Sequence, residues 1–189
     1  MKALFLTNEF PPNVYGGAGV HVEYLTRELA RVMDVEVRCF GEQDLRGERL
    51  TVRGYGAPQA LLGEADARVR GAFDALGRGI AFAATPSDAD VVHCHTWYSH
   101  FGGLLAKMAY GVPLVVTVHS LEPLRPWKRE QLGGGYEISS WVERTALQSA
   151  DAVIAVSAGA RDDILRLFDV APERVHVIHN GIDTEEYRA

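Results

Sequence analysis

The sequence predicts an α/β protein with a doubly wound parallel sheet and helices on both faces. Short β-branched runs alternate with longer segments whose apolar residues recur every three or four positions, as in strands joined by crossover helices. Most of these runs are apolar throughout, which is typical of strands buried on both faces. The 189 residues, of which 47% are hydrophobic and 23% charged, suffice for one compact domain with its own core.

The elements follow in order along the chain. Seven strands are expected, over residues 2–7, 35–40, 50–54, 90–95, 113–119, 152–157 and 174–179. Between the first two strands, Val22, Leu25, Leu29 and Val32 recur at helical spacing and predict an amphipathic helix. Further helices are expected over residues 59–83 with a break near residue 63, over 100–110, over 137–149 and directly after Ser157, a residue type that caps helix starts.

Two loops rich in glycine and proline interrupt this pattern, at residues 8–19 and 122–135. Connections in compact α/β units usually have about 2 to 6 residues, so these two are several times longer than expected. Loops of this kind commonly carry binding residues. Ligands of open parallel sheets gather beyond the carboxyl ends of the strands, where the first of these loops lies.

Charge and cysteine usage limit the function classes. With 19 basic and 25 acidic residues, the chain does not hold nucleic acid through its overall field. Cys39 and Cys94 lie inside predicted strands and are expected to be reduced core residues. The first nine residues do not form a signal peptide, and no apolar run reaches the ~18 residues that span a bilayer. We therefore expect a soluble cytoplasmic protein.

A glycine-rich turn follows the first predicted strand, with the sequence Tyr15-Gly16-Gly17-Ala18-Gly19. Glycines let backbone N–H groups approach a ligand closely, and the start of a helix favours an anion such as a phosphate. The order of glycines matches neither the dinucleotide fingerprint nor the P-loop. A tight turn that needs glycine for its own geometry explains the segment equally well.

The fourth predicted strand ends in a group of imidazoles and aromatic rings. His93 and His95 share one face of the strand and could pair on a metal with His100 or Cys94. Because Cys94 points to the opposite face and no second ligand pair follows, we expect no metal site. A hydrogen bond at the sheet end accounts for His93, whereas His95 and Trp97 are candidates to contact a sugar ring.

The fifth predicted strand runs directly into His119 and Ser120 at the rim of the sheet. Its position makes His119 a candidate functional residue, because neighbouring strand ends converge there. Arg125, Lys128 and Arg144 follow and could hold a phosphate-bearing partner. Ordinary surface charge is the alternative explanation for these three side chains.

Five strings taken together resemble a known family: Tyr15-Gly16-Gly17-Ala18-Gly19-Val20-His21, His93-Cys94-His95-Thr96-Trp97, Thr117-Val118-His119-Ser120, residues 149–157, and Val177-Ile178-His179-Asn180-Gly181-Ile182-Asp183. They occur in order across nearly the whole chain. They resemble the retaining GT-B glycosyltransferases, and most closely the glycogen synthase branch that makes α-1,4-glucan or maltose 1-phosphate. The resemblance implies glycogen biosynthesis and glucose transfer from ADP- or UDP-glucose, with retention.

In that family two Rossmann-like domains face each other across a cleft. The resemblance implies that residues 1–179 form the N-terminal, acceptor-side domain and that residues 180–189 begin the linker to a C-terminal donor-binding domain. That second domain, with the family's glutamate pair, would lie beyond this chain, so the isolated chain is expected to be inactive. The nucleotide sugar is a cosubstrate, and no cofactor or metal is implied. The resemblance gives no oligomeric state.

The resemblance also assigns roles by position. His119 is similar to the histidine that contacts the donor sugar near the reacting carbon, as a hydrogen-bond partner. Gly16 and Gly17 resemble the loop that meets the donor diphosphate. Ser120, Arg125, Lys128 and Arg144 fall where the family holds acceptor phosphates. Glu9, His95 and Trp97 are further acceptor-side candidates because they follow or end predicted strands.

Two departures from the family pattern bear on the acceptor. Bacterial and plant glycogen and starch synthases usually have a lysine just before the paired glycines, where this sequence has Val14-Tyr15, and an aspartate where it has Thr96. A glucose 1-phosphate acceptor is therefore as consistent with the sequence as a long glucan. Two alternatives stay open: a non-catalytic module that binds carbohydrate or phosphate, and a retaining GT-B transferase of another sugar specificity. A nucleotide-dependent oxidoreductase would lack its dinucleotide fingerprint.

Overall fold

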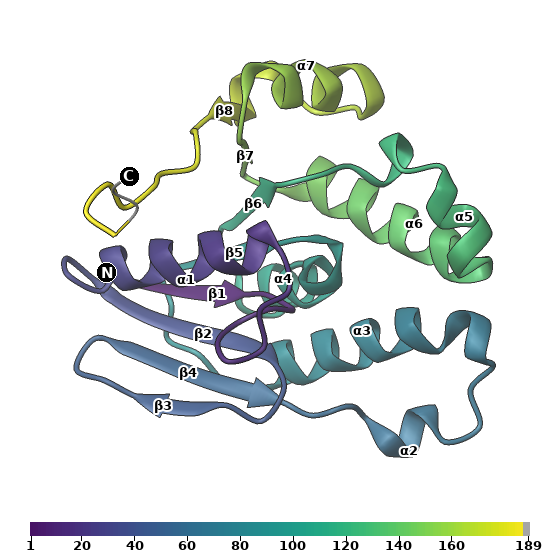
Figure 1. The fold of residues 1–189 in the computed structure, drawn as a ribbon, viewed down its shortest axis with the longest axis horizontal. Coiled ribbons are helices and arrows are strands. Elements are labelled where there is room, and N and C mark those ends of the chain that lie inside the picture. Colours follow the sequence, from purple (N-terminus) through teal and green to yellow (C-terminus); the bar gives the residue numbers. More distant parts are fainter. Residues whose placement is uncertain (187–189) are drawn as a thin grey trace.

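The fold is a single eight-stranded sheet flanked by helices, as seen in the computed structural model (Figure 1). The structure describes residues 1–186, apart from the side chains of Leu61 and Leu132. The strands lie in the order β3-β4-β2-β1-β5-β6-β7-β8, and all pairs are parallel except β3 with β4. Their bounds are β1 Lys2–Leu6, β2 Asp34–Phe40, β3 Asp44–Arg46, β4 Leu50–Tyr55, β5 Val91–His95, β6 Leu114–Val118, β7 Ala152–Ala155 and β8 Val175–Val177.

Helices cover both faces of this sheet. The α-helices are α1 Gly17–Leu29, α2 Gln59–Leu62, α3 Ala67–Ala84, α4 Trp97–Tyr110, α5 Trp127–Leu132, α6 Gly134–Ser149 and α7 Ala158–Leu167, with 3₁₀ turns η1 Glu122–Leu124 and η2 Pro172–Arg174. Alternate residues of β1 divide between two cores. Phe5 packs with Val22 of α1, whereas Leu4 packs with Leu104 of α4 and Ala146 of α6. The α1 face and the α4–α6 face therefore have separate hydrophobic cores.

The α1 face of the sheet carries two of the histidines singled out in the sequence, His93 and His95. Register places His93 beside Phe5 and His95 beside Thr117, so their side chains share the face that Phe5 occupies. The rings of Phe5 and His95 stack with centroids 5.7 Å apart. Cys94 points to the opposite face, where it lies in the core under α4. The sequence prediction that His93 and His95 share a face is confirmed.

A buried arginine fixes the end of α3 against the sheet. Arg38 of β2 is 1% exposed and pairs through Nη2 with the Glu36 carboxylate at 2.6 Å. Its Nη1 donates to the carbonyl oxygens of Phe82 and Thr85, and Nη2 donates to that of Pro86. These carbonyls end the helix and have no helical partner, so the guanidinium satisfies them.

The fold class and the seven predicted strands are confirmed, with ends that differ by up to two residues. The sequence missed β3, because this edge strand has three exposed residues and no apolar pattern. Val32 is 73% exposed and lies beyond α1, so its predicted place on the buried helix face is wrong. The long loop predicted at residues 122–135 is instead mostly helical.

Both cysteines are buried and free, as predicted, and burial raises the pKa of each thiol to about 12. Ser157 caps α7 as predicted, because its hydroxyl oxygen accepts a hydrogen bond from the Ala160 amide at 3.1 Å. Within residues 1–186, none of the helices has the length and apolar character needed to cross a bilayer.

Candidate functional site

The ends of β5 and β6 bring two imidazoles into direct contact. His95 is the last residue of β5, and His119 directly follows β6. His95 Nδ1 lies 3.1 Å from His119 Nε2, and the rings are stacked with centroids 5.4 Å apart. The convergence of these two strand ends, which the sequence predicted, is therefore present in the structure.

A third imidazole comes from α1. His21 lies one turn after Gly17, and its ring centroid is 5.6 Å from that of His95 and 5.1 Å from that of His119. One nitrogen from each of the three rings lies within 4.8 Å of the others. In the sequence, His21 ends the family string that begins at Tyr15, but no role was predicted for it. Its position one helical turn beyond the glycines was the available signal.

Burial dominates the electrostatics of these rings. Burial lowers the pKa of His119 to about 4, and it lowers the pKa of His21 as well. His95 is fully buried, and desolvation followed by the neighbouring imidazoles lowers its pKa well below the usual range. His93 has a pKa lowered to about 3, first by burial, and its Nε2 lies 2.7 Å from Thr117 Oγ1. The predicted sheet-end hydrogen bond of His93 is thus confirmed, and the rings are neutral near pH 7.

The glycine-rich turn is held by a carboxylate. Glu9 Oε2 accepts hydrogen bonds from the amides of Tyr15 at 3.0 Å and Gly16 at 2.9 Å. A Cβ on Gly19 would lie 2.7 Å from Glu9 Oε2, so glycine is required there for packing. A Cβ on Gly17 would meet nothing within 4 Å. The turn geometry therefore explains Gly19, but the space beside Gly17 is open.

This arrangement bears on two predicted residues. Glu9 was an acceptor-side candidate because it follows the first strand, but its carboxylate accepts hydrogen bonds from the turn, which makes it a residue that shapes the loop. Gly16 is the residue before α1, and no side chain caps the helix there. The first amides of α1, beginning at Gly17, therefore point out of the helix start without a capping side chain, as an anion site requires.

Thr96 forms a strained turn between β5 and α4. Its φ is 64°, and positive φ values are rare for β-branched residues such as threonine. Its hydroxyl donates to Asn8 Oδ1 at 2.8 Å and so ties the end of β5 to the loop after β1. Backbone strain of this kind is concentrated at functional sites, where the surrounding contacts maintain it.

Trp97 does not lie beside the imidazoles. As the first residue of α4 it enters the helical layer, where it is 6% exposed, packs near Ala72 and Ala75 of α3, and stacks on Tyr98 with ring centroids 4.2 Å apart. The expected apolar face for a sugar is therefore not available in this structure. The sequence alone could not show that the chain turns into the opposite layer at this residue.

The three predicted basic residues lie in different environments. Lys128 is 8% exposed, and its Nζ donates to the buried Glu122 carboxylate at 2.9 Å, so its charge is already paired. Arg125 lies at the surface, where its Nη1 donates to Ser120 Oγ at 3.3 Å. Arg144 is exposed on α6. Ser120 and Arg125 therefore remain candidates for a phosphate, whereas the structure gives Lys128 a structural pairing instead.

Buried acids support the segment that follows His119. Glu122 accepts from Lys128 and, through Oε2, from the Ser139 hydroxyl at 2.8 Å. Its backbone amide donates to Glu143 Oε2 at 2.9 Å. Burial raises the pKa of Glu143 to about 8, with the charge of Glu122 adding to the effect. These contacts fix the loop that carries Ser120 and Arg125 against α6.

A large cavity adjoins the imidazoles. Its volume is about 1000 Å³, and its lining includes Gly17, His21, His93 and Thr117 together with the segment 178–185. That segment lies along α1, where Arg27 Nη2 meets Asp183 Oδ2 at 3.3 Å. The cavity therefore extends over the part of the sheet that α1 does not cover.

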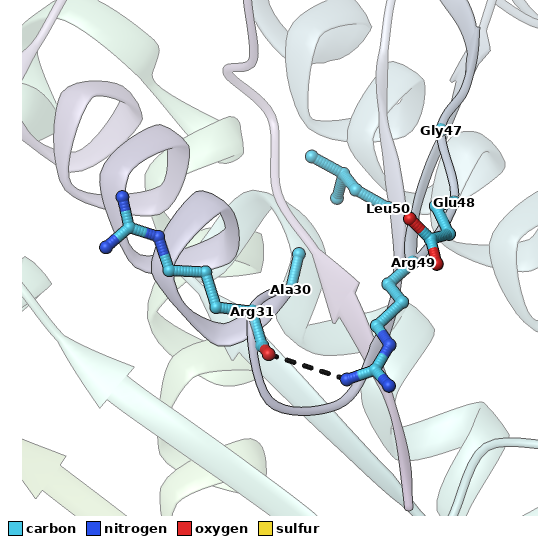
Figure 2. Close-up of a pocket in the computed structure, with 6 residues that line it drawn as sticks. All are labelled: Ala30, Arg31, Gly47, Glu48, Arg49 and Leu50. Atoms are coloured by element: carbon cyan, nitrogen blue, oxygen red, sulfur yellow. Dashed lines mark hydrogen bonds between the residues drawn. The ribbon is translucent and has the colours of Figure 1, made fainter.

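A second, smaller hollow of about 550 Å³ lies at the far end of α1, between Arg31 and residues 47–50. Figure 2 shows Arg49 reaching across it to the Arg31 carbonyl oxygen, at 3.4 Å. It is at the opposite end of the helix from Gly17 and is separate from the imidazole site.

Sequence and fold together define the class of protein. The sequence matches Glycosyltransferase Family 4 over residues 15–186, so the chain belongs to this family. The resemblance to GT-B glycosyltransferases of the glycogen synthase branch is thereby confirmed.

Among curated relatives, the chain is 50% identical over 190 residues to the alpha-maltose-1-phosphate synthase of Mycolicibacterium smegmatis, covering 97% of this chain and 45% of that protein. It is 28% identical over 212 residues to the glycogen synthase of Mycobacterium tuberculosis, covering 99% and 50%. The chain spans about half the length of these relatives.

Solved structures show the same fold at low sequence identity. A sucrose-phosphate synthase from Thermosynechococcus elongatus superposes with a TM-score of 0.71 at 16% identity, covering 98% of this chain and 49% of that one. Anabaena HepE in complex with UDP and glucose superposes with a TM-score of 0.68 at 19% identity, covering 99% and 46%.

Proposed function

We propose that this chain is the acceptor-side half of a glucosyltransferase that transfers glucose, with retention, from ADP- or UDP-glucose to glucose 1-phosphate, giving maltose 1-phosphate for glycogen biosynthesis. The higher identity to maltose-1-phosphate synthases than to glycogen synthase favours the sugar phosphate over a long glucan as acceptor. The lack of a lysine before the glycines and the presence of Thr96 favour it too.

The single observation that carries this proposal is the meeting of the His95–His119 pair with the start of α1. A sugar diphosphate needs hydrogen-bond partners for the ring and positive ends of dipoles for the phosphates. His119 supplies the first as a hydrogen-bond partner of the donor sugar near its reacting carbon. Gly17, at the start of α1, supplies the second, because a phosphate can approach the open backbone beside it, whereas the amide of Gly16 already donates to Glu9 Oε2.

In the proposed transfer, the bond between the sugar C1 and the diphosphate oxygen breaks while a bond from C1 to the acceptor hydroxyl oxygen forms on the same face. The acceptor proton passes to the departing diphosphate. No protein base is required, so positioning and electrostatic stabilisation supply the catalysis. Ser120 and Arg125 hold the acceptor phosphate, with Arg144 contributing from α6.

The site proposed here is half of an active site. Residues 1–179 form the acceptor-side domain, and residues from 180 onwards lead toward a donor-binding domain outside this chain. The chain's coverage of about half of each relative supports this arrangement. The isolated chain is therefore expected to bind substrates weakly and to transfer no glucose.

The test is to express the 189-residue chain alone and again with its natural continuation. Each protein is incubated with ADP-glucose or UDP-glucose and with either glucose 1-phosphate or a glucan, and the products are identified by mass spectrometry and NMR. We expect α-maltose 1-phosphate from the longer protein only. Transfer by the isolated chain at full rate would contradict the half-site, and a product made only on the glucan would contradict the acceptor.

A further inference from the structure

Three imidazoles approach one another from three different elements. His21 comes from α1, His95 from the end of β5 and His119 from the residue after β6. One nitrogen atom from each ring lies within 4.8 Å of the other two, and the pair from His95 and His119 is 3.1 Å apart. The three ligand atoms therefore surround a common point.

This spacing suits a first-row transition metal. Zinc binds imidazole nitrogens at about 2.0–2.1 Å, so two ligands of a tetrahedral site are about 3.3 Å apart. The His95–His119 pair already has nearly this separation. His21 has to approach by no more than about 1.5 Å, given tetrahedral spacing. Its side chain is half-buried and borders the cavity, so it has room to move.

His95 is the most deeply buried of the three rings. It is 0% exposed, and its Nδ1 faces His119, whereas its Nε2 points in another direction and has no hydrogen-bond partner among the residues that the structure describes. Nε2 therefore takes no part in the site, which rests on the spacing of the three rings.

We propose that His21, His95 and His119 form a binding site for one divalent transition-metal ion of the zinc class. Three imidazoles leave a fourth position for water or an anion, and the cavity provides the path of entry. The ion takes the place of the proton that otherwise joins His95 Nδ1 and His119 Nε2.

These ligands differ from those considered in the sequence, where His93 and His95 were paired with His100 or Cys94. His93 is engaged by Thr117, and Cys94 lies on the opposite face of the sheet. Spacing along a single strand therefore points to the wrong partners, because two of the three ligands come from other elements.

The consequence for activity rests on the proposed function. An ion bound to His119 occupies the place where the donor sugar meets this residue, so metal and sugar exclude each other. The metal site itself does not depend on that function and is tested by direct binding.

The experiment uses the untagged 189-residue chain, freed of metal by a chelator. Zn²⁺ is titrated by calorimetry, and Co²⁺ is added to a parallel sample to record the visible absorption of a tetrahedral site. We expect one ion per chain. His21→Gln and His119→Gln should each weaken binding at least about tenfold, because loss of even an outer partner of a ligand costs about 10- to 100-fold.

The matched control replaces an exposed histidine of β8 that does not line the cavity, His176→Gln. This variant removes an imidazole yet should bind as the parent does. Circular dichroism establishes that all variants are folded, and His21 and His119 lie on separate elements, so one can be measured if the other unfolds. Absence of binding, unchanged affinity in both site variants, or loss of binding in the control would each overturn the proposal.

Discussion

Alanine substitution of two glycines in the glycine-rich turn should have different effects on stability, because Gly19 is tightly packed and Gly17 is not. In Gly19→Ala the new Cβ would lie 2.7 Å from Glu9 Oε2 and 2.8 Å from Glu9 Cβ, so Glu9 has to move. Its carboxylate would then lose hydrogen bonds to the amides of Tyr15 and Gly16. Overpacking costs about 1–3 kcal/mol and a hydrogen bond to a charged group about 1.5–3 kcal/mol, but the turn is exposed, so we expect a total loss of about 2–4 kcal/mol.

Gly17→Ala is the matched variant two residues earlier. Its Cβ meets nothing within 4 Å, and alanine is the better helix former by up to about 1 kcal/mol, so stability should be unchanged or slightly raised. Urea unfolding of the 189-residue chain measures both. Equal losses in the two variants, or a stable Gly19→Ala, would refute the reasoning. In the longer protein Gly17→Ala should still lower transfer about 10- to 100-fold, because the methyl group displaces the donor phosphate.

Three further predictions concern buried and basic groups. The pKa of Glu143 is raised from 4.5 to about 8, so the folded state holds a proton that the unfolded state has lost, and stability should fall as pH rises through this window. Between pH 5 and pH 8 the parent should lose at most about 5 kcal/mol of its free energy of unfolding, and Glu143→Gln should not show this loss. The same change in the free energy of unfolding in parent and variant would refute the prediction. Arg38→Met should cost about 3–5 kcal/mol, far more than Arg46→Met at the surface, because it removes one of the two cations that pair with Glu36 and leaves the carbonyl oxygens at the end of α3 without a donor. Similar thermal denaturation of the two variants would contradict these contacts. Arg125→Ala should raise the KM for glucose 1-phosphate at least about tenfold with little change in kcat, as loss of a charged hydrogen bond implies, and an unchanged KM would remove Arg125 from the site.

The sequence predicted the sheet well because buried parallel strands are continuous apolar runs that no other element imitates at this length. It failed where that signal is absent. The exposed strand β3 carries no apolar pattern, and Val32 fits the helical period although the helix has already ended. The segment 122–135 was predicted to be a loop, because a single sequence does not show that Glu122 and Lys128 pair and that both charges are buried.

The candidate site was predicted in the same uneven way. The rule that strand ends converge placed His95 and His119 together, because it depends only on strand order. The rule could not show that Trp97, two residues after His95, lies in the opposite helical layer. It also missed His21, whose contact with the other imidazoles requires the crossing of α1 over the sheet. Glu9 and Lys128 looked available in the sequence, but each is engaged by groups that only the fold brings near.

The role proposed for His119 in glucose transfer is tested by comparing His119→Ala with His176→Ala, a change at an exposed histidine of β8, in the protein that includes the natural continuation of the chain. Turnover of ADP- or UDP-glucose with glucose 1-phosphate and the free energy of unfolding are measured for both. We expect His119→Ala to lower turnover at least about 100-fold while the free energy of unfolding changes by about 1 kcal/mol, and His176→Ala to change neither. A folded His119→Ala protein with unaltered turnover would contradict this role.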